Sequence, residues 1–374
     1  CFGAAGNSSS TLSVSAGGNS LGQLSFTKLA NYQYASVSSK SFTLYDQTAS
    51  SLNITLKHTR SSGVSGHLDY IRASYEAQLS LTGKSYITFS PNNDGIKAFA
   101  LQGASSATSI WDITTPTQTH ELEGTFAGTT CTVAVSGTTF TDKYLAVNTS
   151  ASFPSPELVG QIENQNLHAL DSINLLIIVP ANGKLTAQAQ RLADAHTLKD
   201  GIRCVVVEAD KIYNEFSSGT PDATAYRRLM KMLHDKQYGT SSTLTTTQKG
   251  SLNLLLFGNC MWDNRLLTSG LTSKSQDDYL LAYESDNSWS HTDSYVMEEY
   301  FTLLADGKGI SPLKEKPDCG VGRIPVTTAS EAKAVVDKLI SYMYNIHAGA
   351  WKNTICLMGD DGNGNIHMQQ ADRI

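Results

Sequence analysis

A run of five consecutive apolar residues at 175–179, Leu-Leu-Ile-Ile-Val, is the feature that most constrains the fold. A strand with one face in water alternates apolar and polar side chains, whereas a strand covered on both faces is apolar throughout. Further strand-like runs alternate with stretches of helical spacing: strands at 204–207, 252–257, 320–324 and 354–358, helices at 185–198, 220–234 and 328–346. The alternation predicts a mainly parallel sheet covered by helices over 166–374.

The residues before this region follow a different pattern. Short runs with period-two alternation recur between Gly-, Ser- and Asn-rich turns, and Ser and Thr make up 29% of residues 1–165. Charged residues are 11% of this half, against 21% of the other half. The pattern predicts an antiparallel β-sandwich over 21–165 that ends in an extended Pro-rich linker at 153–156. The Ser- and Gly-rich residues 1–20 are predicted to be a disordered lead-in.

Charge and hydropathy exclude two classes of function. The formal net charge is −6, and no cluster of Lys and Arg is visible, which excludes electrostatic nucleic-acid binding as the main role. No apolar run reaches the roughly 18 residues that a membrane span needs.

Ligands of open parallel sheets bind beyond the carboxyl ends of the strands. Three such ends are followed here by a predicted loop at 208–219, by 258–260 and by 359–365. Asp361, in Asp360-Asp361-Gly362, can orient an imidazole from a strand end, although an ordinary Asx/Gly turn has the same sequence. Asp361, Asn363 and Asn365 also have the alternate spacing of a calcium loop, without its central Gly and distal Glu. No cofactor is expected, and a structural calcium stays an alternative.

Cys260 can be a nucleophile only if a histidine activates it, and His291 and His367 are the candidates. The alternative is that Cys260 packs beside Trp262. His367 is either a solvated surface side chain or part of a pocket. None of the six cysteines has metal-ligand spacing. Buried free thiols are favoured over disulfides. Cys1 is either a lipid-anchored cysteine or an incidental start. An acidic group forms either a solvated face or a cation site: Asp277, Asp278, Glu298 and Glu299.

Several strings resemble the gingipain-type cysteine peptidases, and within them the PorU-type signal peptidase/sortase branch of type IX secretion. The longest and most specific is 212–225, Ile-Tyr-Asn-Glu-Phe-Ser-Ser-Gly-Thr-Pro-Asp-Ala-Thr-Ala. Shorter matching strings occur in the same order along the chain: 68–71, 110–116, 164–168, 320–326 and 351–362.

The resemblance implies a caspase-like catalytic domain preceded by β-sandwich modules, on the bacterial cell surface at the outer membrane. It implies a peptidase and transpeptidase that removes C-terminal domains from secreted cargo and joins the cargo to a lipopolysaccharide amine, beside a PorV-like outer-membrane β-barrel partner. It aligns Asp361 with the acidic residue that orients the catalytic histidine. It aligns His367 near the substrate pocket, where arginine-specific members carry an acid.

In this family the catalytic His and Cys follow the region that corresponds to residue 374. Residues 368–374 have a helical pattern without a stop signal, so we expect the 166–374 domain to be truncated and the chain to be inactive alone. The alternative function is a non-enzymatic surface scaffold that binds an outer-membrane partner.

Overall fold

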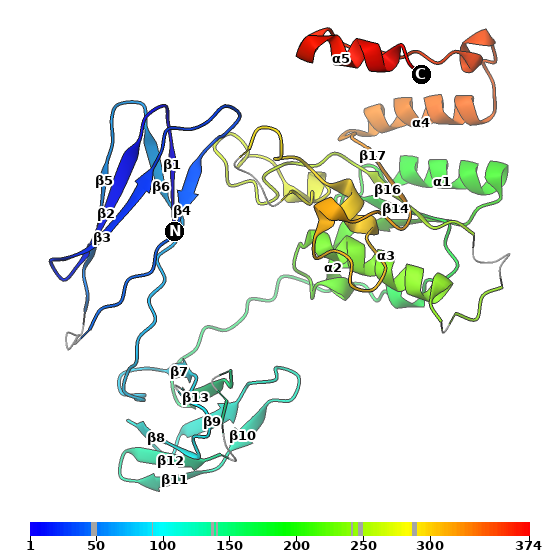
Figure 1. Ribbon diagram of the computed structural model, residues 1–374. Helices are drawn as coiled ribbons and strands as arrows, with labels where there is room; N and C mark the ends of the chain where they lie inside the picture. Colours follow the sequence, from blue (N-terminus) through cyan, green and yellow to red (C-terminus); the bar gives the residue numbers. More distant parts are fainter. Residues whose placement is uncertain are drawn as a thin grey trace. The chain divides into compact units, whose positions relative to one another are not determined.

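The computed structural model describes residues 1–45, 51–91, 93–135, 138, 139, 141–240, 242–245, 250–285 and 290–374 (Figure 1). The chain divides into two units: Leu68–Ile162 with Cys1 form one, and Phe2–His67 with Glu163–Ile374 form the other. Antiparallel sheets occupy the N-terminal region and a parallel sheet with helices the C-terminal region, which confirms the predicted fold class. The boundary at 67/68 divides the single β-sandwich that was predicted over 21–165.

Two three-stranded antiparallel sheets lie within 2–68, in the orders β3-β2-β5 and β4-β1-β6. Their shared core contains apolar side chains from both sheets, with Phe2, Leu12 and Phe26 among them. The strands are β1 (Phe2–Ala5), β2 (Ser10–Ala16), β3 (Asn19–Phe26), β4 (Ser36–Ser38), β5 (Ile54–Thr59) and β6 (Ser65–Leu68).

The prediction of a disordered lead-in at 1–20 is wrong. Strand β2 buries every second residue, because Leu12, Val14 and Ala16 point inward between serines and threonine. Gly17 and Gly18 adopt φ values of +54° and +85° and form the two-residue turn to β3. The Ser- and Gly-rich composition therefore belongs to an alternating strand and its hairpin turn, and not to disorder.

The unit 68–162 contains two further antiparallel sheets, in the orders β10-β9-β13-β7 and β11-β12-β8. Leu101, Ile110, Cys131, Val133 and Ala146 are each at most 4% exposed and form the core between them. The strands are β7 (Tyr86–Phe89), β8 (Ala98–Gln102), β9 (Thr108–Asp112), β10 (His120–Leu122), β11 (Gly124–Ala127), β12 (Thr130–Ala134) and β13 (Tyr144–Asn148).

The C-terminal region is built on a parallel sheet of order β15-β14-β16-β17. Its strands are β14 (Leu175–Val179), β15 (Cys204–Glu208), β16 (Asn253–Phe257) and β17 (Gly320–Ile324). The helices are α1 (Thr186–Asp200), α2 (Ala209–Phe216), α3 (Ala223–Tyr238), α4 (Ala329–Met343) and α5 (Gly362–Ala371), with 3₁₀ turns η1 (Leu167–Ala169), η2 (Gln276–Asp278), η3 (Glu298–Thr302), η4 (Pro312–Lys314) and η5 (Ala350–Asn353).

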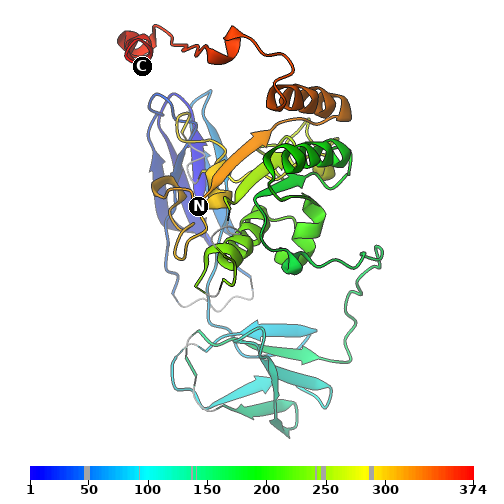
Figure 2. The ribbon, with the colours of Figure 1, turned by 90° about the vertical axis from the view of Figure 1, so that its right-hand side faces the viewer.

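Helices cover both faces of the parallel sheet (Figure 2). On one face, α1 and α4 pack around Ile177, Val179 and Phe257. On the other face, α2, α3 and η3 pack around Leu176, Ile178 and neighbouring side chains. The five apolar residues of β14 therefore alternate between two cores, as the uninterrupted apolar run predicted. Among the described residues, none of the helices has the length and apolarity needed to cross a membrane.

Local signals set the helix starts. Thr328 and Glu331 form the predicted capping box, because each side chain accepts a hydrogen bond from the other residue's backbone N–H. Asp222 caps α3 by accepting from the N–H of Thr224 at 2.8 Å, two residues after the predicted start at Thr220. The interval 208–219, expected as a loop, holds α2, whose Ile212 and Tyr213 are buried against the sheet.

The prediction of a strand at 354–358 is wrong in this structure. No strand among the described residues pairs with this segment. Ile355 and Met358 are 85% and 92% exposed, so the apolar side chains that suggested a covered strand lie in solvent. A β-strand forms only against a neighbour that accepts its backbone hydrogen bonds, and an apolar run alone does not supply that neighbour.

Candidate functional site

The carboxyl end of β16 is held by Arg323, which lies on the adjacent strand β17. Its guanidinium binds both carboxylate oxygens of Glu298, at 2.5 and 3.0 Å, and donates to the carbonyl of Gly258 at 3.0 Å. The arginine side chain is only 9% exposed. The paired charges thus fasten η3 and β16 together at the sheet edge where a ligand site was predicted.

Cys260 lies at this edge but is not activated there. Burial raises the pKa of its thiol, and the nearby carboxylates of Glu298 and Glu284 raise it further, against an opposing effect of Arg323. No histidine among the described residues hydrogen-bonds to Cys260. A nucleophilic cysteine needs a lowered pKa and an adjacent base, so the structure favours the packing role for Cys260 over the catalytic one.

Burial also raises the pKa of three other cysteine thiols. All six cysteines are free. Burial raises the pKa of Cys131 and Cys204, and it raises the pKa of Cys319 to about 12. Such thiols are protonated at neutral pH and behave as small apolar side chains.

Asp361, the predicted helper carboxylate, lies at the N-terminus of α5 and is exposed. The next residues turn sharply, because Asn363, Gly364 and Asn365 have φ values of +52°, +69° and +66°. Among the described residues, no group donates a hydrogen bond to the Asp361 carboxylate. Since 354–358 is not a strand, Asp361 does not stand at a strand end as the sequence predicted.

The neighbouring Asp360 makes the contact that the sequence suggested for Asp361. Its carboxylate lies 3.2 Å from Nδ1 of His367 and accepts a hydrogen bond from the N–H of Gly362 at 3.0 Å. The turn at 363–365 brings His367 back beside Asp360, which lies seven positions earlier in the sequence. No helix or strand periodicity predicts that approach, so sequence reasoning could not have identified the pair.

Two of the four acidic residues considered as a cation site pair with different cations. Asp278 pairs with Lys184 at 2.6 Å, and this hydrogen bond lowers the pKa of the carboxyl group. Glu298 pairs with Arg323 instead. Over the described ranges, no group of three or more His, Cys, Asp and Glu side chains is placed to hold a metal ion.

Glu215 anchors a network that the sequence analysis did not identify. Its carboxylate accepts from the N–H of Leu167 at 2.7 Å, from Nε2 of Gln165 at 2.8 Å, and from the N–H and Nδ1 of His168 at 3.2 and 2.7 Å. Burial raises the pKa of Glu215, but these hydrogen bonds outweigh it and lower the pKa to about 2. Two separate strings of the resemblance, 164–168 and 212–225, therefore meet at one carboxylate.

The string 212–225 and the residue after it, Tyr226, also contribute to the core. The hydroxyl groups of Tyr213 and Tyr226 lie 2.5 Å apart, and Tyr226 accepts a hydrogen bond from the N–H of Leu281 at 3.4 Å. Tyr226 is fully buried, and its ring also contacts Phe301. These tyrosines tie α2 and α3 to the segment before η3.

Comparisons with known proteins concern the family and the fold of the chain. The model of peptidase family C25 matches residues 168–374, more than half of the chain. A search of curated proteins finds no match. Among solved structures, the chain is similar to dimeric latent PorU from Porphyromonas gingivalis, with a TM-score of 0.73 and 24% identity over 96% of this chain and 34% of that chain.

That likeness shows a shared fold, and the chain spans about a third of the length of the PorU chain. The family model covers the whole parallel sheet, its helices and the string 212–225. The chain therefore belongs to peptidase family C25, the gingipain family.

Proposed function

We propose that this chain contributes to a cysteine peptidase and transpeptidase that removes C-terminal domains from secreted cargo at the bacterial cell surface. The C25 family match and the PorU-like fold support this proposal. The proposed partners are the cargo domains, a lipopolysaccharide amine as acceptor and a PorV-like outer-membrane β-barrel.

The proposed reaction is acyl transfer. A cysteine thiolate attacks the peptide carbonyl, and an imidazole passes a proton to the departing amine of the C-terminal domain. An amine or water then attacks the thioester and regenerates the thiol. In this proposal Asp361 orients the imidazole and His367 contributes to the substrate pocket. The resemblance of 351–362, which aligns Asp361 with the acidic residue that orients the imidazole, supports this assignment, and the Asp361 carboxylate is exposed.

The catalytic thiol and imidazole of this proposal are not a pair among the described residues. Burial raises the pKa of Cys131, Cys204, Cys260 and Cys319, and none of them hydrogen-bonds to a histidine. We therefore expect the 374-residue chain alone to give no thiol-dependent cleavage of a tagged cargo domain. Cleavage that disappears in Cys260→Ala would overturn this expectation.

The role of Asp361 is tested by replacing it with Ala in the gene of the source organism and following release of C-terminal domains from cargo. Loss of imidazole orientation lowers turnover by roughly 10- to 10⁴-fold. The control, Asp372→Ala, changes another exposed carboxylate near α5 and leaves turnover unchanged. Unchanged release at normal protein level in Asp361→Ala would contradict the catalytic assignment and favour the scaffold function. Loss of the protein itself would make Asp361 a structural turn residue.

A further inference from the structure

The dipeptide Asn-Gly occurs twice in the chain, at 182–183 and at 363–364. In this dipeptide the backbone nitrogen of the glycine can attack the side-chain carbonyl carbon of the asparagine, because glycine has no Cβ to obstruct the approach and its backbone adopts many conformations. The reaction requires the asparagine side chain and the glycine N–H to rotate toward each other. The two copies therefore place the same reactive sequence in two structural environments.

Asn182, in the loop between β14 and α1, is held at both reacting groups. Its Nδ2 donates to Asp278 Oδ1 at 2.5 Å, and its Oδ1 accepts from the N–H of Lys184 at 2.9 Å. The N–H of Gly183, the nitrogen that would attack, donates to the carbonyl of Pro180 at 3.4 Å. These hydrogen bonds must break before the ring can close, and this requirement slows the reaction.

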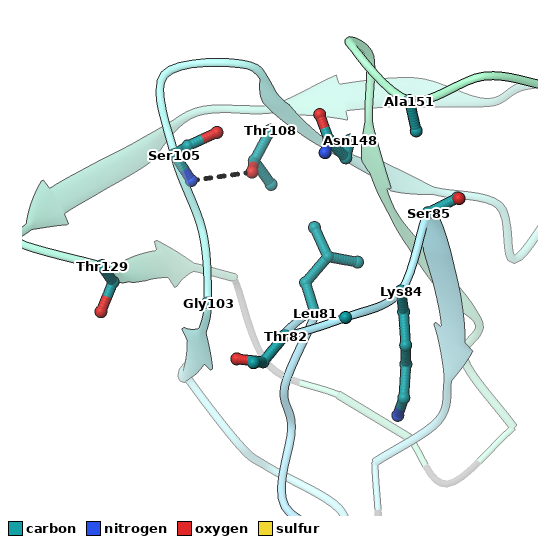
Figure 3. A pocket seen from close by; sticks show the side chains of 11 residues that line it. Leu81, Thr82, Lys84, Ser85, Gly103, Ser105, Thr108, Thr129, Asn148 and Ala151 are labelled. Carbon is teal, nitrogen blue, oxygen red and sulfur yellow. Dashed lines mark hydrogen bonds between the residues drawn. The ribbon is translucent and has the colours of Figure 1, made fainter.

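Asn148 is a second restrained asparagine, and Figure 3 shows it beside Thr108 at the end of β13. Its Oδ1 accepts from the N–H of Ser150 at 3.0 Å, and the N–H of the next residue, Thr149, donates to the carbonyl of Ala107 at 2.8 Å. Because the next residue is also β-branched, its side chain crowds the attacking nitrogen. Asn148 is therefore an unreactive reference within the same chain.

Asn363 has neither restraint. Its side chain is exposed and forms no hydrogen bond with the described residues. A Cβ on the next residue, Gly364, would meet nothing within 4 Å, so the backbone there has open space around it. None of the residues of α5 is buried, so the turn at 363–365 can change conformation without breaking packed contacts.

We propose that Asn363 is a site of spontaneous covalent modification, at which the backbone of the chain converts the asparagine into aspartate and isoaspartate. The nitrogen of Gly364 loses its proton and attacks Cγ of Asn363, so a C–N bond forms, the bond to the amide nitrogen breaks and ammonia leaves. Water then opens the five-membered imide at either carbonyl, which gives aspartate or isoaspartate. Water is the only co-reactant, and nothing is oxidised or reduced.

The modification changes the turn that places His367 beside Asp360. Either product adds a negative charge two positions after Asp361, and isoaspartate also lengthens the backbone path of the turn by one carbon. The 3.2 Å contact between Asp360 and His367 spans this turn. The inference does not depend on peptidase activity, so its failure and the failure of the proposed function are distinguishable.

The test is incubation of the 374-residue chain in mildly alkaline buffer, followed by mass spectrometry of tryptic peptides. Peptide 353–373 contains both Asn363 and Asn365, which shares the exposed turn but precedes the β-branched Ile366. We expect fragment ions to place the mass increase at Asn363, with a rate about tenfold or more above that of Asn182. Equal rates at Asn182 and Asn363, or no reaction at Asn363, would overturn the proposal.

Unfolding shows whether the structure causes the difference. In concentrated urea the hydrogen bonds around Asn182 are lost, so we expect Asn182 and Asn363 to react at equal rates. A difference that persists in urea would contradict the structural explanation. In the folded chain, Asp278→Ala removes the acceptor of Asn182 Nδ2, and we expect the reaction at Asn182 to accelerate by roughly two- to tenfold while Asn363 is unchanged. An unchanged rate at Asn182 would contradict the protective role of Asp278.

Two variants of the turn complete the test. Gly364→Ala adds a Cβ beside the attacking nitrogen, and we expect the reaction at Asn363 to slow several-fold. Ile366→Gly changes a side chain that is 44% exposed and puts a glycine after Asn365, so Asn365 should become as reactive as Asn363. Circular dichroism checks that both variants are folded. If Asn365 stays unmodified in folded Ile366→Gly, exposure and a following glycine do not suffice, and the proposal fails.

Discussion

Two strings that resemble the C25 family differ in burial. The string 212–225 is embedded, with Tyr213 bonded to the fully buried Tyr226 and with Glu215 accepting hydrogen bonds from four groups. The string 351–362 is exposed, and no backbone N–H of 355–361 is hydrogen-bonded within the described residues.

We infer that the two strings match the family for different reasons. The string 212–225 matches because it builds the core that supports the parallel sheet, and substitution there acts through stability. The string 351–362 contributes little to the core, and we propose that its acidic residues serve chemistry instead.

The largest expected difference is in hydrogen exchange, between the central strand β14 and residues 355–361. We expect the amide of Ile177 in the central strand to exchange only on global unfolding, with an opening free energy on the order of 5–15 kcal/mol. The amides of 355–361 are expected to exchange with an opening free energy near zero, because they are exposed and unbonded. Mass spectrometry measures the exchange, and comparable protection of the two segments would contradict this prediction.

Tyr226→Ala removes the most buried ring of the embedded network. We expect the free energy of unfolding to fall by about 3–5 kcal/mol, the usual cost of truncating a buried aromatic side chain. The matched control is Ile355→Ala in the exposed string, where the expected change is within about 0.5 kcal/mol. Denaturant unfolding of both variants measures the difference, and equal losses would show that 351–362 is also structural.

Glu215→Gln tests the carboxylate at which two strings meet. The folded pKa of about 2 lies below the ordinary value of 4.5, so the ionised group stabilises the fold by about 3 kcal/mol above pH 4.5. This contribution is lost as the pH falls through 4.5 toward 2. Unfolding measured from pH 7 to 2 should show this acid loss in the natural chain and a smaller one in Glu215→Gln. Identical slopes would contradict the network.

Asp361→Ala and Asp360→Ala should have the smallest effects on stability. Both residues are exposed, and we expect each variant to unfold within about 0.5 kcal/mol of the natural chain. The thermal midpoints of the two variants check this. A loss above about 2 kcal/mol in Asp361→Ala would identify it as a structural turn residue and remove the argument for a chemical role.

The sequence predicted the parallel sheet because uninterrupted apolar strands and capped helices are local signals. Thr328 with Glu331, and the run 175–179, required no knowledge of distant residues. The strand at 354–358 was wrongly predicted, because an apolar run does not specify a pairing partner. The four bonds of Glu215 and the approach of His367 to Asp360 were missed because they join residues through turns and tertiary packing, which have no sequence period.

We propose that the described residues provide the scaffold and a helper carboxylate of a C25 peptidase but no activated thiol. Alkylation of each cysteine as a function of pH, followed by mass spectrometry, tests it most directly. We expect Cys131, Cys204, Cys260 and Cys319 to react slowly, with rates still rising above about pH 9. A cysteine with an apparent pKa below about 7 that returns to an ordinary value when one histidine is replaced would contradict the account.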